Sequence, residues 1–332
     1  MIHTVLFILI FKSFTGVQHN EPTAKVTENP FELLSCDKIW DKAPHNAFTD
    51  IIRFKGRWFL IFREAGGHVS YDGTFRILTL NNGGNWESAS QIALEKVDLR
   101  DAKYSVSPGR QLMITGGGRS GTSFQSYTWF SDDGIHWSRP FEIGDTNFWL
   151  WRTTWHHKNA YNFGYSSNRN DTLKLYSSRD GKTFKLILNE TGVKSYPNET
   201  SIVFKKDTAF CLLRRDGTIN SGLVGVALPP YNSWSWKDLG IKIGGPYMMV
   251  LPNGKLLAAV RLYGNDKGLQ TRTSLCLVDP PSGKLTEVLS LPSGGDTSYA
   301  GMVLFKNVLW ISYYSSHEGK TSIYLAKVKI AA

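Results

Sequence analysis

The sequence has only three cysteines, Cys36, Cys211 and Cys276, among its 332 residues. A small and odd number of cysteines argues against a disulfide framework, and their wide spacing fits no metal-ligand motif. We therefore expect the three side chains to be buried as small apolar groups.

The chain also lacks an apolar run long enough to span a bilayer. Residues 4–11, within the opening MIHTVLFILIFKSFTGVQ, have instead the length of the apolar region of a signal peptide. We predict that residues 1–18 are a signal peptide and that the protein is secreted or periplasmic, with no stable membrane insertion. Retention of this segment as a membrane anchor is the alternative.

No basic tract accompanies the net charge of +10, because Lys and Arg are scattered along the chain. Proteins that follow a phosphate backbone cluster their basic residues, so we expect no nucleic-acid partner. An acidic sugar or an anionic cell-surface polymer fits the charge equally well. The glycine-rich segment GGGRSGTS (116–123) has no helix after it, so we predict no nucleotide site and no cofactor.

Helical periodicity is absent as well, whereas aromatic residues make up 13% of the chain. These features are typical of an all-β protein with many short strands. Apolar hairpins such as DIIRFKGRWFLIFRE recur with a period of about fifty residues, which is the size of a four-stranded propeller blade. Their six turns fall near Gly56, Gly109, Lys158, Lys206, Gly254 and Lys306. We predict a six-bladed β-propeller of four-stranded antiparallel blades over residues 44–332, preceded by an N-terminal tail at 19–43.

A second repeated motif occurs as LNNGGNW (80–86), SDDGIHW (131–137) and SRDGKTF (178–184). These segments resemble the Asp-box of sialidase-like propellers, in which the Asp side chain accepts backbone N–H bonds within the turn. Gly supplies the unusual backbone angle there, and the aromatic residue packs between sheets. We therefore interpret Asp133 and Asp180 as structural.

The adjacent histidines His156 and His157 lie at the end of a predicted strand. Neighbouring strand residues point to opposite faces, so the two imidazoles should not bind one metal ion together. We interpret both as structural histidines and predict no metal site.

Candidate catalytic residues emerge from the geometry of a propeller, because the same ends of all inner strands meet around one axis. Tyr299, in SGGDTSYAGMV, precedes the inner strand of the sixth hairpin, and Glu199, in YPNETSIVF, precedes that of the fourth. The two side chains are therefore expected to meet at the central funnel.

Several segments, in their sequence order over residues 44–328, resemble the sialidase (neuraminidase) superfamily. FREAGGHVSYDG resembles the segment in which Glu64 would precede a catalytic acid, Asp72, on a loop. NETSIVFKKDTAFCLLRR resembles the segment that joins the glutamate to a carboxylate-binding arginine, at Arg214 or its neighbour Arg215. TRTSLCLVD would supply a second such arginine, Arg272, and GGDTSYAGMV the tyrosine nucleophile.

The resemblance implies a retaining exo-glycosidase acting on a terminal sialic acid or a related acidic sugar. Because the substrate carries a carboxylate, a neutral phenol can approach its anomeric carbon where an anionic nucleophile would be repelled. Tyr299 would attack, Glu199 would accept the phenol proton, and Asp72 would act as general acid and then as general base. Arginines would bind the substrate carboxylate.

One departure from the family pattern concerns the first arginine of the carboxylate-binding triad. Ala47 and Phe48 stand where it would fall. Side chains from other blades could bind the substrate in its place. The further candidates for substrate binding are Glu64, Arg63, Arg100, Arg152 and Arg261. A glycosidase of the same fold with a different glycan, or a non-catalytic carbohydrate-binding propeller, would also explain the loss.

Overall fold

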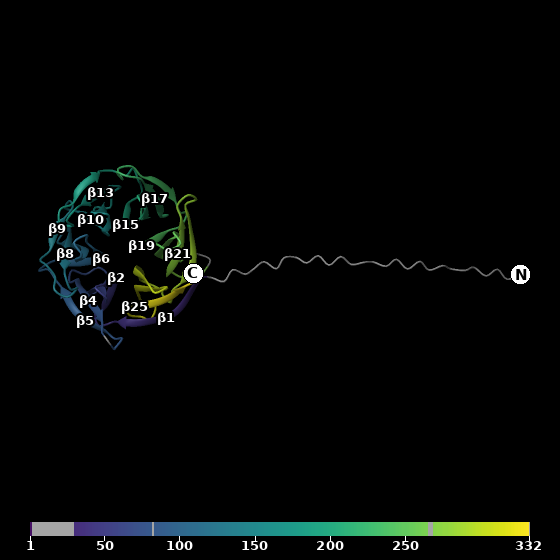
Figure 1. Cartoon of the computed structure of the whole chain (residues 1–332), viewed down its shortest axis with the longest axis horizontal. Coiled ribbons are helices and arrows are strands. Elements are labelled where there is room, and N and C mark those ends of the chain that lie inside the picture. Colours follow the sequence, from purple (N-terminus) through teal and green to yellow (C-terminus); the bar gives the residue numbers. More distant parts are fainter. Residues whose placement is uncertain (2–29, 82, 265–267, 332) are drawn as a thin grey trace.

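The chain forms an all-β, six-bladed propeller, as predicted (Figure 1). The structure is a computed structural model that describes residues 1, 30–81, 83–264 and 268–331. The predicted signal peptide lies, apart from its first residue, outside this range. No helix among the described residues has the length and apolarity needed to cross a bilayer.

Each blade is a four-stranded antiparallel sheet. Blade 1 contains β2 (His45–Phe54), β3 (Arg57–Ala65), β4 (Thr74–Leu80) and β5 (Trp86–Ile92). Blade 2 contains β6 (Asp98–Val106), β7 (Leu112–Ser120), β8 (Ser123–Ser131) and β9 (Phe141–Ile143). In blade 3 the inner strand is split into β10 (Phe148–Leu150) and β11 (Thr154–His156), followed by β12 (Asn159–Ser166), β13 (Leu173–Ser178) and β14 (Lys185–Leu188).

Blades 4 to 6 follow the same order from the inner to the outer edge. Blade 4 contains β15 (Pro197–Lys205), β16 (Thr208–Arg215), β17 (Leu223–Ala227) and β18 (Ser235–Asp238). Blade 5 contains β19 (Ile243–Val250), β20 (Leu256–Leu262), β21 (Arg272–Asp279) and β22 (Lys284–Ser290). Blade 6 contains β23 (Thr297–Phe305), β24 (Val308–Ser315), β25 (Ser322–Ile330) and, as its outer strand, β1 (Phe31–Trp40).

Strand β1 closes the ring, because it pairs antiparallel with β25 from Phe31↔Ile330 to Trp40↔Ile323. The sequence predicts an N-terminal tail at 19–43, which includes residues 31–40. In the structure they are part of the last blade, so the propeller begins before residue 44.

The predicted hairpins are confirmed in all six blades. At the β2–β3 turn Lys55 and Gly56 both have positive φ, at 46° and 84°. At the β23–β24 turn Lys306 and Asn307 do so too, at 50° and 61°. Two consecutive positive φ angles define the turn that best matches the twist of paired strands.

The Asp-box turns have the predicted geometry. Asp133 Oδ1 accepts the backbone N–H groups of Ile135 and His136 at 2.8 and 2.9 Å. Asp180 Oδ1 accepts those of Lys182 and Thr183, both at 2.8 Å. Both carboxylates are therefore occupied by their own turns.

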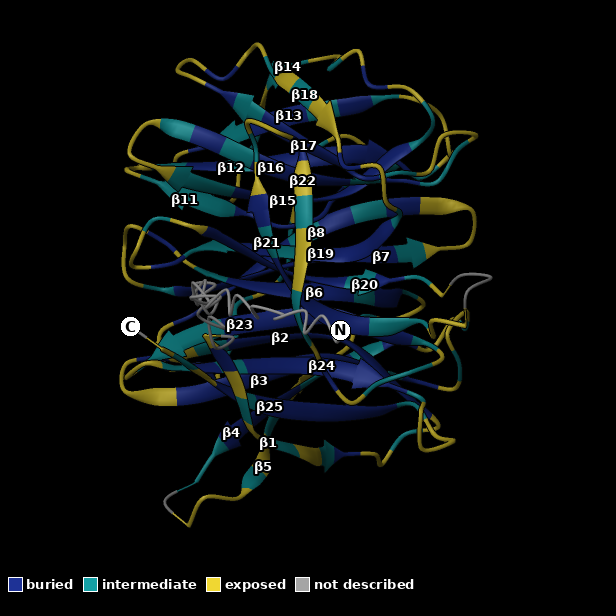
Figure 2. Ribbon diagram, turned by 90° about the vertical axis from the view of Figure 1, so that its right-hand side faces the viewer, coloured by how far each residue is buried: buried dark blue, intermediate teal, exposed yellow. Residues whose placement is uncertain are grey.

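The core lies between the blades, and burial decreases from the inner strands to outer strands such as β5, β14 and β22 (Figure 2). Trp58 of blade 1 stacks on Trp310 of blade 6 with ring centroids 4.2 Å apart, which joins the first and last sheets. Cys211 and Cys276 are fully buried, as expected. Cys36 is only half-buried, and its Sγ lies 3.0 Å from the Tyr313 hydroxyl.

Candidate active site

The inner strands share an irregularity near their first residues, at the end of the central channel that holds Tyr299. Five of them shift register there against the second strand of the blade, and such bulges redirect side chains. The shifts lie between Ala47 and Asp50, Arg100 and Lys103, Pro197 and Thr200, Gly244 and Tyr247, and Ser298 and Gly301. Four of the bulges contain a residue with positive φ, namely Phe48, Asp101, Gly245 and Tyr299.

Tyr299 and Glu199 meet across the channel, although they come from blades 6 and 4. The Tyr299 hydroxyl donates a 2.6 Å hydrogen bond to Glu199 Oε1. Arg214 Nη1 lies 2.8 Å from the same carboxylate oxygen and 2.9 Å from the phenol oxygen. The three groups form one buried hydrogen-bonded cluster, because Tyr299 and Glu199 are only 7% and 6% exposed.

Gly245 of blade 5 completes the support of the Glu199 carboxylate. Its backbone N–H donates to Glu199 Oε2 at 2.8 Å, so both carboxylate oxygens have a donor. A Cβ atom at this glycine would lie 2.7 Å from the Tyr299 ring, and φ is +54°. Only glycine fits this close approach without displacing the tyrosine.

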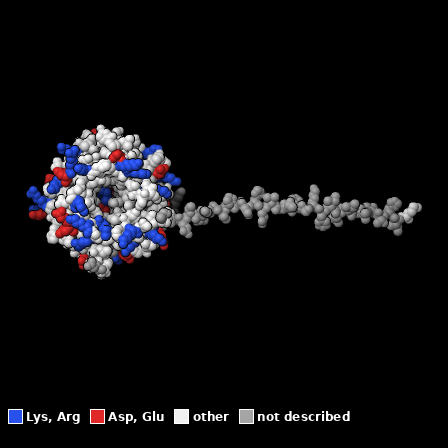
Figure 3. Space-filling view, viewed as in Figure 1, with Lys and Arg blue, Asp and Glu red and all other residues white. Residues whose placement is uncertain are grey.

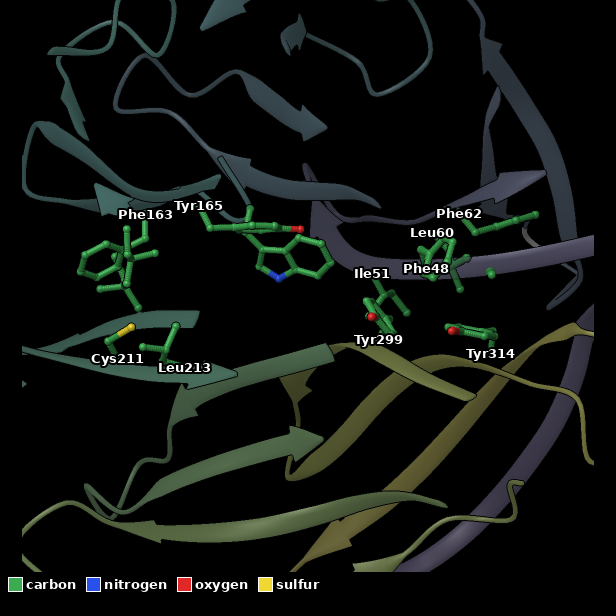
Figure 4. Packing of buried hydrophobic residues seen from close by; sticks show 14 of the residues in the cluster. Phe48, Ile51, Leu60, Phe62, Phe163, Tyr165, Cys211, Leu213, Tyr299 and Tyr314 are labelled. Atoms are coloured by element: carbon green, nitrogen blue, oxygen red, sulfur yellow. The ribbon is translucent and has the colours of Figure 1, made fainter. Parts of the chain in front are cut away.

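An aromatic wall surrounds the Tyr299 ring, and Figure 4 shows Phe48, Tyr299 and Tyr314 lying together. Their centroids lie 5.0 Å (Phe48) and 5.8 Å (Tyr314) from that of Tyr299, and Trp151 follows at 5.6 Å. Phe48, which with Ala47 stands where the sequence resemblance predicts an arginine, thus contacts the predicted nucleophile directly. No cation replaces that arginine at this position.

Burial, reinforced by the negative charge of Glu199, raises the pKa of Tyr299 well above its ordinary value, while Arg214 and Arg261 oppose the shift. The phenol is therefore protonated at neutral pH. A nucleophile in this state needs a neighbouring base, and Glu199 Oε1 is in contact with its proton.

Asp101 is a buried acid in the blade 2 bulge that the sequence did not single out. Its side chain is 4% exposed, and Oδ1 has no hydrogen-bond partner among the described residues. Burial raises the pKa of Asp101, with a further increase from Glu199 and an opposing effect from Lys103. The available signal was a charged run, LRDAK, inside a predicted inner strand.

Asp72 lies on the exposed loop between β3 and β4, where its Oδ2 accepts the Gly66 N–H at 2.9 Å. Hydrogen bonds from Ser70 and from the Gly66 backbone lower the pKa of Asp72, so it is ionised at neutral pH in this arrangement. No contact of Asp72 with Tyr299 or Glu199 is among the described interactions.

Arg63 stabilises this loop. Its guanidinium is fully buried and donates to Asp98 Oδ1 at 2.7 Å, Gly67 O at 2.9 Å and Ser70 Oγ at 3.0 Å. These N–H groups are occupied and shielded from solvent. Arg63 therefore presents no accessible guanidinium edge to a substrate, as the predicted substrate-binding role would require.

Arg261 lies beside Tyr299, with its guanidinium carbon 5.3 Å from the ring centroid. It donates to Asp296 Oδ1 at 3.0 Å and to the Tyr314 hydroxyl at 2.8 Å. Asp296 Oδ2 lies 3.3 Å from His45 Nε2 and 2.6 Å from His68 Nδ1. The loop that holds Asp72 is thereby linked, through His68, to the segment that precedes Tyr299.

The structure does not bring the other predicted substrate-binding residues to this cluster. Arg272 begins the third strand of blade 5, and its Nε donates to Glu287 on the outer strand at 2.8 Å. Glu64 accepts Trp40 Nε1 at 2.7 Å and Arg76 Nε at 2.9 Å. Neither contacts Tyr299, Glu199 or Arg214.

Three further arginines, Arg152, Arg100 and Arg215, have partners outside the Tyr299 cluster. Arg152 donates to Asp50 Oδ2 at 3.0 Å and lines a cavity of about 490 Å³ near the opposite ends of the inner strands. Arg100 Nε donates to Asp98 Oδ2 at 2.8 Å. Arg215 Nε donates to Ser221 O at 2.8 Å, so Arg214 is the arginine of the pair that reaches the cluster.

The prediction that His156 and His157 diverge is wrong. His157 lies in the β11–β12 turn with φ of 52°, and its ring centroid is 4.1 Å from that of His156. Strand alternation does not hold across a left-handed residue. Both Nε2 atoms lie 3.2 Å from Asp207 Oδ1.

Lys and Arg are distributed around the face seen in Figure 3, whose centre is hollowed, and they form no continuous tract there. The distribution agrees with the scattered basic residues in the sequence.

Comparison with protein-family models and with curated protein sequences finds no match. Solved structures do match the fold. A protein of unknown function from Dyadobacter fermentans is 16% identical with a TM-score of 0.78, over 91% of this chain and 99% of its own. An α-L-arabinanase from Penicillium chrysogenum, solved with arabinobiose, is 12% identical with a TM-score of 0.71, over 90% and 99%.

A sialidase from Trypanosoma rangeli, solved with the inhibitor DANA, is 15% identical with a TM-score of 0.66. The match covers 86% of this chain and 55% of that enzyme. The chain therefore has a sialidase-like propeller fold that arabinanases also adopt, and its neighbours include glycoside hydrolases that bind carbohydrate ligands.

Proposed function

We propose that the protein is a retaining glycosidase that uses Tyr299 as nucleophile and Glu199 as its base. The observation that carries the proposal is the 2.6 Å hydrogen bond from the Tyr299 hydroxyl to Glu199 Oε1, formed between blades 6 and 4. A phenol and a carboxylate so far apart in sequence, both buried and in direct contact, form the nucleophile–base pair that covalent catalysis requires.

In the first step the Tyr299 oxygen attacks the anomeric carbon while its proton passes to Glu199. The bond to the leaving oxygen breaks. Asp72, which takes up a proton from solvent once the loop has left its contact with Gly66, gives that proton to the leaving oxygen. Arg214, 2.9 Å from the phenol oxygen, stabilises negative charge that develops there. In the second step Asp72 accepts a proton from water, and the water oxygen attacks the anomeric carbon. The bond from that carbon to the Tyr299 oxygen breaks, and Glu199 returns its proton to the phenol oxygen.

We propose an acidic sugar, with sialic acid first, as the substrate. A neutral nucleophile suits a substrate that carries a carboxylate at the reacting carbon. Arg214 and Arg261 lie on two sides of Tyr299 and supply positive charge. The T. rangeli sialidase was also solved as a covalent intermediate with 2,3-difluorosialic acid and with a difluoro-KDN compound, which supports both sugars as first candidates.

A different glycan is the second candidate, and Phe48 favours it. Phe48 is one of the two residues, with Ala47, that stand where the arginine was expected, and its ring packs against Tyr299. The charges of the two nearby arginines are also partly satisfied, because Arg214 pairs with Asp216 at 2.8 Å and Arg261 with Asp296 at 3.0 Å. A sugar without a carboxylate would lose less binding free energy from the missing arginine. The arabinanase neighbour, solved with arabinobiose, is an example of this fold with a neutral sugar.

The deciding experiment is a panel of fluorogenic glycosides of sialic acid, KDN and neutral sugars, assayed with the full chain. We expect turnover of a sialoside or KDN glycoside and, with the matching 2,3-difluoro sugar, a covalent adduct on the peptide that contains Tyr299. Turnover of a neutral glycoside alone would select the second candidate. Binding without turnover of any member would identify a carbohydrate-binding propeller instead.

Export is part of the same proposal, because residues 4–11 have the length of the apolar region of a signal peptide. Secretion or periplasmic location would be checked by fractionation and by N-terminal sequencing of the mature protein, which we expect to begin after residue 18.

A further inference from the structure

The turns at the far ends of two inner strands bring together a second group of polar side chains, remote from Tyr299. His156 and His157 belong to the β11–β12 turn of blade 3, and Asp207 belongs to the β15–β16 turn of blade 4. Glu199 lies near the start of β15, whereas Asp207 follows its last residue, Lys205. The group is therefore separated from the candidate active site by the length of an inner strand.

The distances within this group fit the coordination sphere of a metal ion. Both imidazole Nε2 atoms lie 3.2 Å from Asp207 Oδ1, and all three atoms lie within 4.8 Å of one another. Ligands about 2.0–2.1 Å from a tetrahedral ion are separated from each other by about 3.3 Å. Among the other imidazole–carboxylate pairs, His136–Asp133 and His68–Asp296 are closer, at 2.7 and 2.6 Å, whereas His45–Asp296 is similar at 3.3 Å.

Surrounding residues hold two of the three ligands in place. The His156 ring stacks on Phe204 with centroids 4.1 Å apart and an interplanar angle of 4°. Tyr231 donates its hydroxyl to the backbone oxygen of Asp207 at 3.1 Å. Outer contacts of this kind orient metal ligands and contribute to affinity.

Solvent can reach the group of His156, His157 and Asp207. The side chains of His157 and Asp207 are 73% and 65% exposed, and that of His156 is 14% exposed. An ion bound by the three side chains would complete its coordination with water, and two imidazoles and one carboxylate suit Zn²⁺ and similar divalent transition ions.

We propose that His156, His157 and Asp207 form a binding site for a divalent transition-metal ion, with Zn²⁺ as the test ion, that joins blades 3 and 4. The other group with metal-ligand spacing, His45, His68 and Asp296, is a weaker candidate. There Arg261 donates to Asp296 at 3.0 Å, and its buried positive charge opposes a cation.

The test is calorimetric titration of the metal-stripped full chain with Zn²⁺. We expect one saturable site, and we expect His157→Ala or Asp207→Ala to weaken it by about 100-fold or more, because each removes a ligand. Both residues are exposed, so the variants should fold, which circular dichroism would check. Tyr231→Phe should weaken binding by about tenfold through the loss of one outer contact.

Control variants separate this site from other histidines. His136→Ala removes an exposed imidazole that has a single carboxylate partner, and His68→Ala disrupts the other group; both should bind Zn²⁺ as the unmodified protein does. A Co²⁺ titration should give visible absorption bands that His157→Ala abolishes. The proposal is overturned by an absence of saturable binding, by binding that survives His157→Ala, or by binding that His68→Ala abolishes.

Discussion

The two ends of the inner strands differ in how they depart from regular β-structure. At the Tyr299 end the departures are bulges within the strands, and these bulges contain buried acids such as Glu199 and Asp101. At the other end they are tight turns, exposed to solvent, that join the inner strand to its neighbour. Bulges near the channel make a solvent-shielded cluster suited to chemistry, whereas turns at the rim make an open group suited to an ion.

Tyr299→Phe should cause the largest loss of activity among the changes at the two ends of the inner strands. The change removes only the hydroxyl that contacts Glu199 and Arg214, so kcat should fall by about 10⁴-fold while substrate binding persists. Tyr313→Phe is the matched control, because that buried hydroxyl of the same blade bonds to Pro292 O and lies outside the cluster. Full activity in Tyr299→Phe would remove the covalent mechanism.

Glu199→Gln should have the next largest effect. The amide keeps an acceptor for Arg214 but cannot take the phenol proton, so kcat should fall by about 10³-fold. Glu64→Gln provides the comparison, since its carboxylate is held by Trp40 and Arg76 away from the cluster. Steady-state kinetics on the best glycoside of the panel would measure both, and equal losses would contradict the assignment of Glu199.

Two glycines of the same blade allow the ends of β19 to be compared directly. Gly245→Ala places a Cβ 2.7 Å from the Tyr299 ring, and the displacement of the ring should lower kcat by about 10²-fold. Gly254→Ala, in the turn at the other end, also has a positive φ but meets only the flexible end of Lys205. It should cost about 1–2 kcal/mol of stability and leave activity unchanged. Similar losses of kcat in the two variants would show that the bulge at Gly245 does not position Tyr299 for catalysis.

Asp296→Asn should have the smallest effect on catalysis of these changes and should act chiefly on stability. Although burial acts in the opposite direction, His45, His68 and Arg261 lower the pKa of Asp296 well below its ordinary value. Its stabilising contribution is therefore present above the unfolded pKa of about 4 and is lost as pH falls towards the folded pKa. Loss of charge-assisted bonds to Arg261 should cost about 1–3 kcal/mol at neutral pH.

The measurement is denaturant unfolding of both proteins from pH 7 down to pH 3. The difference in free energy of unfolding should be largest at neutral pH and should shrink below pH 4. A difference that stays constant over this range would mean that the Asp296 charge does not stabilise the fold.

The repeated hairpins and Asp-box turns could be predicted from the sequence because their information is local. Alternating apolar residues and a Ser-x-Asp-Gly turn determine their own geometry within a few residues. Tyr299 and Glu199 could be brought together because a propeller places equivalent strand ends around one axis.

The remaining features depend on backbone irregularities that side-chain patterns do not encode. Asp101 lies in the register shift between Arg100 and Lys103, where it is buried and interacts electrostatically with Glu199, and alternation along the strand gives no sign of this. The left-handed φ of His157 likewise brings it beside His156. Arg261 and Arg272 are both arginines on strands of blade 5, and only the packing of blade 6 distinguishes the one that reaches Tyr299.

The pairing of Phe31 with Ile330 also bears on how the chain folds. A contact between residues so distant in sequence carries a large loop-closure entropy and belongs to the slowest class of folding events. The ring cannot close until the last strand has been synthesised, so the chain remains open while it emerges from the ribosome.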